Sequence, residues 1–101
     1  MADNAIILTL IARIPAAGIA DFRAYEDQVL PLLAAHNGVL QRRLRGADGG
    51  VEGHIVRFSS AVAFDGFPAD PRRAHHAHLL ERSGAAMESL VMEDVASCAL
   101  A

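Results

Sequence analysis

The chain has 101 residues, a formal net charge of −3 and a hydrophobic share of 52%. This length fits one domain, residues 1–101, and the mild acidity argues against nucleic acid or an anionic membrane surface as the main partner. The apolar run over residues 5–12 is far too short to span a bilayer, so we expect no membrane association.

Cysteine usage and hydrophobicity bear on compartment and assembly. Cys98 is the one cysteine of the chain, so no intrachain disulfide can form, and the first residues carry no basic leader segment. Both observations predict a cytoplasmic, reducing compartment. The hydrophobic share is more than one small core readily hides, so we also expect a homo-oligomer.

The first predicted element is a strand over residues 5–14. The segment is short, rich in β-branched residues and ended by Pro15. Both of its faces are apolar, with Leu8 on one face and Ile7 on the other. This pattern is typical of a central strand that is covered on both sides.

Residues 19–36 follow a helical period. One stripe collects the larger side chains of this segment, namely Phe22, Tyr25, Val29, Leu32, Leu33 and His36. The stripe predicts an amphipathic helix, which Pro31 should kink. Asn37-Gly38 should end this helix, because glycine readily takes the left-handed conformation at a helix C-terminus.

The next segment predicts a β-hairpin. Residues 39–45 alternate, so that the two leucines of this strand face away from Gln41, Arg43 and Arg45. A glycine-rich loop and the return strand follow in residues 46–58. We expect the arginine cluster to guard a sheet edge against pairing with another strand.

Two short helices are predicted between residues 59 and 84. The first is apolar and carries Phe67. Asp70-Pro71 starts the second, because Asp accepts the free backbone N–H groups and Pro needs no donor at the first helical position. The second helix contains the three clustered histidines, His75, His76 and His78.

Residues 87–95 suit either a helix or a strand, and periodicity alone does not decide between them. With a strand there, the order of elements is βαββαβ, the ferredoxin-like α+β plan. This plan places both helical regions on one face of a four-stranded antiparallel sheet. The other face is partly apolar, so a second subunit is its simplest cover.

Four segments carry a resemblance to a known superfamily. They are VLPLLAAHNGVL, HIVRFSS, FDGFPADPRR and LLERSGA. With these segments in this order, the chain resembles the dimeric α+β barrel superfamily, above all its small bacterial proteins of unknown function. The resemblance implies a homodimer with two sheets packed face to face, and it favours a strand over residues 87–95. The superfamily is similar in fold to antibiotic-biosynthesis monooxygenases, small isomerases and haem-degrading oxygenases, so the fold does not name a reaction.

The candidate site is the gap between the second helical region and the sheet. On a continuous helix His76 points between the two leucines at positions 79 and 80, toward this gap. Tyr25 and His36 lie on the stripe of the first helix and could reach the same place. We expect His76 to act as a general base while Tyr25 and His36 orient a substrate. Further candidate substrate-binding residues are Phe22, His54 and Phe67, and the sheet face that carries His54 stays open.

The first functional hypothesis is a cofactor-independent monooxygenase or isomerase that binds a small apolar, phenolic or enolic compound. No metal is expected, because the three clustered histidines diverge around a helix. The alternative is a non-enzymatic dimeric binding or structural module whose core is filled by its own side chains. A third alternative is haem binding through His76, which the resemblance suggests, although the chain lacks the Trp of the haem-degrading branch.

Overall fold

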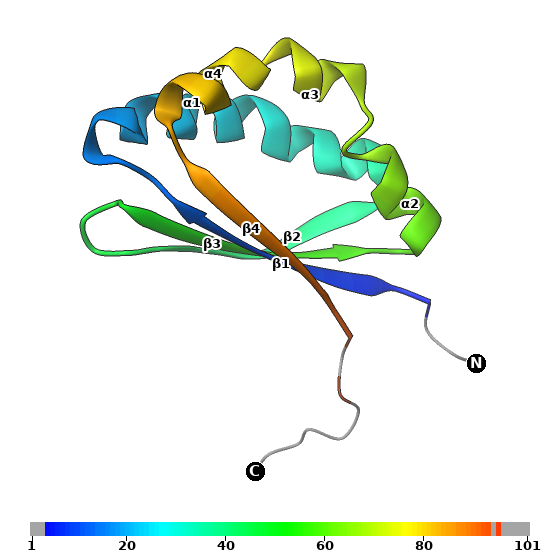
Figure 1. The fold of residues 1–101 in the computed structure, drawn as a ribbon. Helices are drawn as coiled ribbons and strands as arrows, with labels where there is room; N and C mark the ends of the chain where they lie inside the picture. Colours follow the sequence, from blue (N-terminus) through cyan, green and yellow to red (C-terminus); the bar gives the residue numbers. More distant parts are fainter. Residues whose placement is uncertain (1–3, 94, 96–101) are drawn as a thin grey trace.

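The computed structural model describes residues 4–93 and 95. Four antiparallel strands form one sheet in the order β2–β3–β1–β4 (Figure 1). The strands are β1 (Ile6–Arg13), β2 (Gly38–Arg45), β3 (Val51–Phe58) and β4 (Ala86–Met92). The helices lie together on one face of this sheet (Figure 1). The strand order and the helical layer confirm the ferredoxin-like α+β fold that the sequence predicts.

The helical layer consists of two runs that follow β1 and β3. The segments are η1 (Ala16–Gly18), α1 (Ile19–Val29), η2 (Leu30–His36), α2 (Ala61–Gly66), α3 (Pro71–His75) and α4 (Ala77–Ser83). α1 lies against α4, and Gly18 permits this approach because a Cβ at that position would overlap the backbone of Ser83. Among the described residues, no helix is both long and apolar enough to cross a membrane.

The helix predicted over residues 19–36 is divided into two segments. The α-helical part ends at Val29, and the chain continues in 3₁₀ turns to His36. Pro31 lies at the start of the 3₁₀ segment. Because proline has no N–H to donate to the preceding turn, the change of helix type at this place follows from the sequence.

The residue that ends this helical run differs from the prediction. Asn37, and not Gly38, takes the left-handed conformation, with φ of 54°. Asparagine tolerates this conformation because its short polar side chain can bond locally. Gly38 is required for packing instead, since a Cβ there would lie 2.8 Å from the ring of Phe58.

The second predicted helix is divided as well. Asp70 caps its start as predicted, with Oδ1 accepting a hydrogen bond from the Arg72 backbone N–H at 2.8 Å. α3 then ends at His75, because His76 takes φ of −104° and ψ of 2°, outside the α-helical region. A new helix starts at Ala77. The helical phase that predicted the direction of the His76 side chain is therefore interrupted.

A bulge in β2 changes which of its side chains face the helices. Leu40 and Arg42 pair with successive residues of β3, so Gln41 is an extra residue in the ladder. Arg43 and Arg45 consequently lie on the same face as Leu40, toward the helices. The simple alternation predicted for this strand, with the arginines opposite the leucines, is wrong for this reason.

Arg43 and Arg45 bind Glu52 of β3, a carboxylate that is fully buried. Glu52 Oε1 accepts from Arg43 Nε at 2.9 Å, and Oε2 accepts from Arg45 Nε at 3.0 Å. His54 Nε2 lies 3.0 Å from Oε1. Burial raises the pKa of Glu52, but the hydrogen bonds from Arg43, His54 and Arg45 outweigh it and lower the pKa to about 2. β2 is an edge strand, as expected of the arginine cluster, yet two of its arginines serve the interior.

The last described element is a strand, Ala86–Met92, which agrees with the implication of the resemblance. Cys98 lies outside the described residues.

The main core packs the helices on β1 and β3 and consists of Leu8, Tyr25, Val29, Leu33, Val56, Phe58 and Phe67. A second cluster consists of Ala12, Ile14 and Phe22. Even-numbered residues of β1 and β3 thus face the helices, and odd-numbered residues face the open side of the sheet.

We predict that Glu52→Gln lowers the free energy of unfolding by about 2 to 3 kcal/mol at neutral pH, because it leaves the Arg43 and His54 donors without their carboxylate. The ion pair with Arg45 adds little to this loss of stability, because the Arg45 side chain is 40% exposed and water screens its charge. The folded-state pKa of Glu52 is depressed from 4.5 to about 2, so its contribution is present above pH 4.5 and is lost as the pH falls toward 2.

Urea unfolding followed by circular dichroism at several pH values measures this effect. The wild type and the variant should converge in stability as the pH falls. Glu81→Gln is the matched control, because Glu81 is exposed and lies on α4, away from the sheet. An equal loss in both variants would contradict the role given to Glu52.

Candidate functional site

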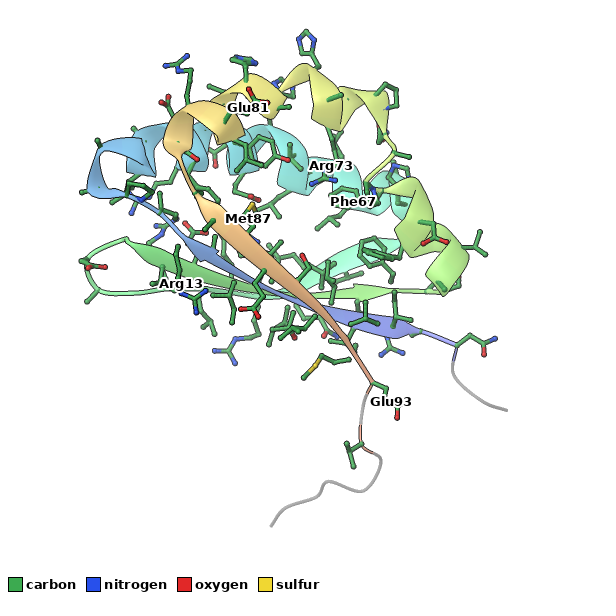
Figure 2. All side chains as sticks on the ribbon, in the orientation of Figure 1. Arg13, Phe67, Arg73, Glu81, Met87 and Glu93 are labelled. Carbon is green, nitrogen blue, oxygen red and sulfur yellow. The ribbon has the colours of Figure 1, made fainter. Side chains whose placement is uncertain are left out.

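A cavity lies between the helices and the sheet. Its walls are mainly apolar and come from β1, α1, η2, β3 and β4. Figure 2 shows Arg73 and Phe67 in the space between the helical layer and the sheet, with Met87 on β4; all three line the cavity. The cavity volume is about 40 Å³, which is room for about three water molecules. The polar groups in the wall are Glu26, His54 and Arg73.

Glu26 brings a buried carboxyl group to this apolar wall. It lies on α1, and only 3% of the residue is exposed. Burial raises the pKa of Glu26 from 4.5 to about 7, although the nearby charges of Arg43 and Arg73 oppose the shift. Near neutral pH this group therefore exists in both protonation states, as a general base or acid requires.

His54 lies between two carboxyl groups. Its Nε2 is 3.0 Å from Glu52 Oε1, and its Nδ1 is 4.0 Å from Glu26 Oε2. Because Glu52 is ionised and can only accept, Nε2 must carry the hydrogen, and Nδ1 of the neutral ring is then an acceptor. This tautomer is assigned from the hydrogen bond. His54 thus presents a proton acceptor toward Glu26 and the cavity.

Arg73 supplies the cationic group of the cavity. It extends from α3, and its guanidinium carbon lies 4.5 Å from the centre of the Phe67 ring. Its Nη2 donates to the hydroxyl of Tyr25 at 3.2 Å. Its Nε is buried and has no hydrogen-bond partner among the residues that the structure describes. Arg73 is therefore held by an aromatic ring and a phenol, while its buried Nε–H has no acceptor among the described residues.

This arrangement can perform proton chemistry on a small bound molecule. Glu26 is placed to take or give a proton, and His54 stands behind it as a second acceptor. Arg73 can stabilise a negative charge that forms on the molecule. Within residues 4–93 and 95, no three His, Cys, Asp or Glu side chains are grouped so as to hold a metal ion.

The structure brings some of the sequence-predicted residues to the cavity. His54 and Phe67 line it, and the helix-facing side of the sheet is the one that carries His54. Tyr25 is buried in the main core and reaches the cavity wall through its bond with Arg73. Phe22 does not line the cavity, since it packs in the second core cluster.

The other two predicted histidines lie elsewhere. His36 Nε2 is 2.7 Å from Asp70 Oδ2, so this histidine joins the end of η2 to the start of α3. His76 is half-buried at the junction of α3 and α4, with its ring 4.9 Å from that of His75, and it does not line the cavity. The break in the helix at His76 accounts for this difference.

Sequence reasoning missed the two charged residues that matter most here. Glu26 directly follows Tyr25, but it lies beside the predicted stripe and not on it. Arg73 was not singled out, because nothing in its local sequence distinguishes an inward from an outward arginine. Only Glu26 had a signal in the sequence: a residue next to the apolar stripe of an amphipathic helix is expected to be partly buried.

Solved structures of other proteins share the fold of this chain. Neither protein-family models nor curated protein sequences match the chain. The cofactor-independent oxygenase SnoaB from Streptomyces nogalater superposes with a TM-score of 0.78 at 18% identity, over 93% of this chain and 96% of that one. Rv0793 from Mycobacterium tuberculosis gives 0.69 at 21%, over 92% and 99%. A proposed antibiotic biosynthesis monooxygenase from Nitrosomonas europaea gives 0.78 at 5%, over 96% of each chain.

At these identities the likeness shows the fold alone. It spans nearly the full length of both chains in each comparison, so no large element is missing or added. The chain therefore has the ferredoxin-like α+β fold, and the solved structures that share this fold include a cofactor-independent oxygenase and proposed antibiotic biosynthesis monooxygenases.

Proposed function

We propose that the protein catalyses a cofactor-independent reaction that starts with removal of a proton from a small enolic or phenolic compound. The observation that carries the proposal is Glu26, a buried carboxyl group with a pKa of about 7 in the wall of an apolar cavity. A base of this kind is poised to exchange a proton near neutral pH. The base is Glu26 and not His76, because His76 lies outside the cavity.

Removal of the proton by Glu26 leaves a substrate carbanion, which can react in two ways. In an isomerisation the proton returns to a different carbon. In an oxygenation a CH₂ group and O₂ give a carbonyl and water. The carbanion gives electrons to O₂, a C–O bond forms, and the peroxide takes a proton. A base then removes the second C–H proton, the O–O bond breaks, and hydroxide leaves as water. The carbon loses four electrons and O₂ gains four.

His54 and Glu52 support this role from behind the base. Glu52 fixes the His54 ring with Nε2–H bonded and Nδ1 toward Glu26. A proton that Glu26 accepts can pass to Nδ1 if the 4.0 Å separation closes to hydrogen-bond distance. The resulting imidazolium would be stabilised by the ionised Glu52. The pair Glu26–His54 thus offers two places for one proton.

The volume of the cavity favours a second candidate function. About 40 Å³ is far less than a pocket for a large organic ligand needs. The alternative is a non-enzymatic dimeric module whose interior is filled by its own side chains. The two candidates differ in one measurable property, since only the first makes Glu26 exchange protons with a bound compound.

We also propose that the open side of the sheet packs on a second copy of the chain. This face carries apolar side chains from all four strands: Ile7, Ile11, Val39, Leu44, Val51, Ile55, Leu90 and Met92. Several are well exposed, Val39 at 60% and Met92 at 50%. A contiguous apolar face of this kind is typical of an oligomer interface.

The first prediction for the proposed function concerns proton exchange. In D₂O, the wild type should speed deuterium incorporation into some members of a panel of small enolisable ketones and phenols, measured by NMR. Glu26→Gln should lower this rate by about 100-fold, because it removes the base. The wild-type rate should rise with pH to a plateau, with a midpoint near the Glu26 pKa of about 7.

Glu81→Gln is the matched control, because Glu81 is also on a helix but is exposed. It should retain the wild-type rate. Exchange that is equal in both variants, or absent for every compound of the panel, would favour the filled-core module.

The second prediction concerns stability. The folded-state pKa of Glu26 is raised from 4.5 to about 7, so the contribution of Glu26 to stability is greatest below pH 4.5 and falls as the pH rises through 7. Glu26→Gln should remove this fall, and the variant should exceed the wild type by about 2 to 3 kcal/mol at about pH 8. Urea unfolding measures the difference, which should vanish at about pH 4.

The third prediction concerns assembly. Leu90→Arg places a charge on the open sheet face, where Leu90 pairs with Thr9, and should convert a wild-type dimer into a monomer. Val62→Arg is the control, because Val62 is 81% exposed on α2, away from this face. Sedimentation velocity measures both. A monomeric wild type, or a Leu90→Arg variant that stays dimeric, would refute the interface.

A further inference from the structure

The cavity wall contains one cation whose neutralisation depends on Glu26. Glu26 and Arg73 are the carboxyl group and the guanidinium that line the cavity. Glu52 is bound by Arg43 and Arg45. When Glu26 is protonated, the described lining therefore holds Arg73 and no carboxylate to neutralise it. An interior with an unpaired cation favours an anionic guest.

Arg73 has the contacts of a preformed anion receptor. Stacking on Phe67 and the bond to Tyr25 hold its guanidinium in place, yet it forms no ion pair with any described residue. Its Nε–H is buried without an acceptor, which costs free energy that a bound carboxylate oxygen would recover. The hydroxyl of Tyr25, which accepts from Nη2, keeps its own hydrogen to donate.

The cavity limits the size of such a guest. A volume of about 40 Å³ corresponds to about three water-sized groups. One end of the guest must meet Arg73, while the remaining wall is apolar and includes Leu8, Val56 and Met87. A long or bulky molecule does not fit this space, and a molecule without an acidic group leaves Arg73 unpaired.

We propose that the cavity binds a short-chain monocarboxylate, with the carboxylate on Arg73 and the short apolar chain among Leu8, Val56 and Met87. This proposal rests on the proposed function and narrows its substrates to the smallest acids that carry an enolisable carbon. The carboxylate on Arg73 would hold the acid in the same cavity as Glu26, the proposed base.

A thermal-unfolding series with unreactive carboxylates tests the binding step. The probes are formate, acetate, propionate, butyrate and octanoate, each compared with sodium chloride at the same ionic strength and with the uncharged amide of the same length. The wild type should show a saturable rise in Tm of a few degrees. The rise should be greatest for formate and acetate, the acids whose size is nearest to the cavity volume, smaller for propionate and butyrate, and absent for octanoate and for the amides.

Two arginine variants give the test its specificity. Arg73→Gln should abolish the shift, whereas Arg82→Gln should retain it, because Arg82 is exposed and pairs with Asp21 at the surface. If Arg73→Gln does not fold, the chain-length series on the wild type still decides. Stabilisation that grows steadily with chain length, equals that of the amides, or survives in Arg73→Gln would overturn the proposal.

The failure of this inference can be distinguished from the failure of the proposed function. If carboxylates do not bind but Glu26-dependent deuterium exchange into neutral ketones or phenols is observed, the proposed reaction stands and the acid is excluded. If short carboxylates bind through Arg73 but no compound shows exchange, the cavity is a receptor for small acids and the enzymatic proposal falls.

Discussion

The buried carboxylate of Glu52 is the interaction on which the rest of this structure depends. Carboxylates are rarely buried unless they are fully paired, and here two guanidinium groups and one imidazole supply the donors. The pairing joins the edge strand β2 to β3 through side chains as well as through the ladder. It also determines the tautomer of His54, and so decides that an acceptor nitrogen is directed toward Glu26.

The two glutamates near His54 show how one small region can hold opposite acid strengths. Glu52 is surrounded by donors and stays ionised far into the acid range, whereas Glu26 shares the burial but has no such set of hydrogen bonds. Environments that separate the pKa values of neighbouring acids are a recurrent feature of sites that move protons. The separation also implies that Glu26 weakens the fold at neutral pH, as groups kept for function often do.

Much of the fold follows from the sequence by local rules. The two-faced apolar strand around Leu8, the cap at Asp70-Pro71 and the glycine-rich loop before Val51 each depend on residues close together in the chain, and each occurs as predicted. The site does not follow in this way. Neither the bulge at Gln41 nor the break at His76 is marked by a local sequence signal. The bulge turns Arg43 and Arg45 toward the helices, and the break interrupts the helical phase that predicted the direction of His76.

Charged side chains were the least predictable part for a related reason. The burial of Glu26 and the inward direction of Arg73 depend on elements more than forty residues apart, α1 and α3. Long side chains can turn toward water or toward the core from the same backbone position, so periodicity does not distinguish these outcomes. The aromatic positions were easier, because Phe67 and Tyr25 have only one favourable direction.

The bulge at Gln41 also bears on which misfolded states the chain avoids. A β2 paired without the bulge would slip by one residue beyond Leu40, which turns Leu44 inward and both arginines outward. Judged by hydrophobicity alone, that alternative register looks more favourable than the native one. It would, however, place Arg42 opposite His54 in place of Arg43, and Leu44 opposite Glu52 in place of Arg45. The buried carboxylate would then lose one of its two guanidinium partners, which is costly for a buried charge. A single acidic side chain thus selects between two pairings of the same strand, and the apolar residues would select the other.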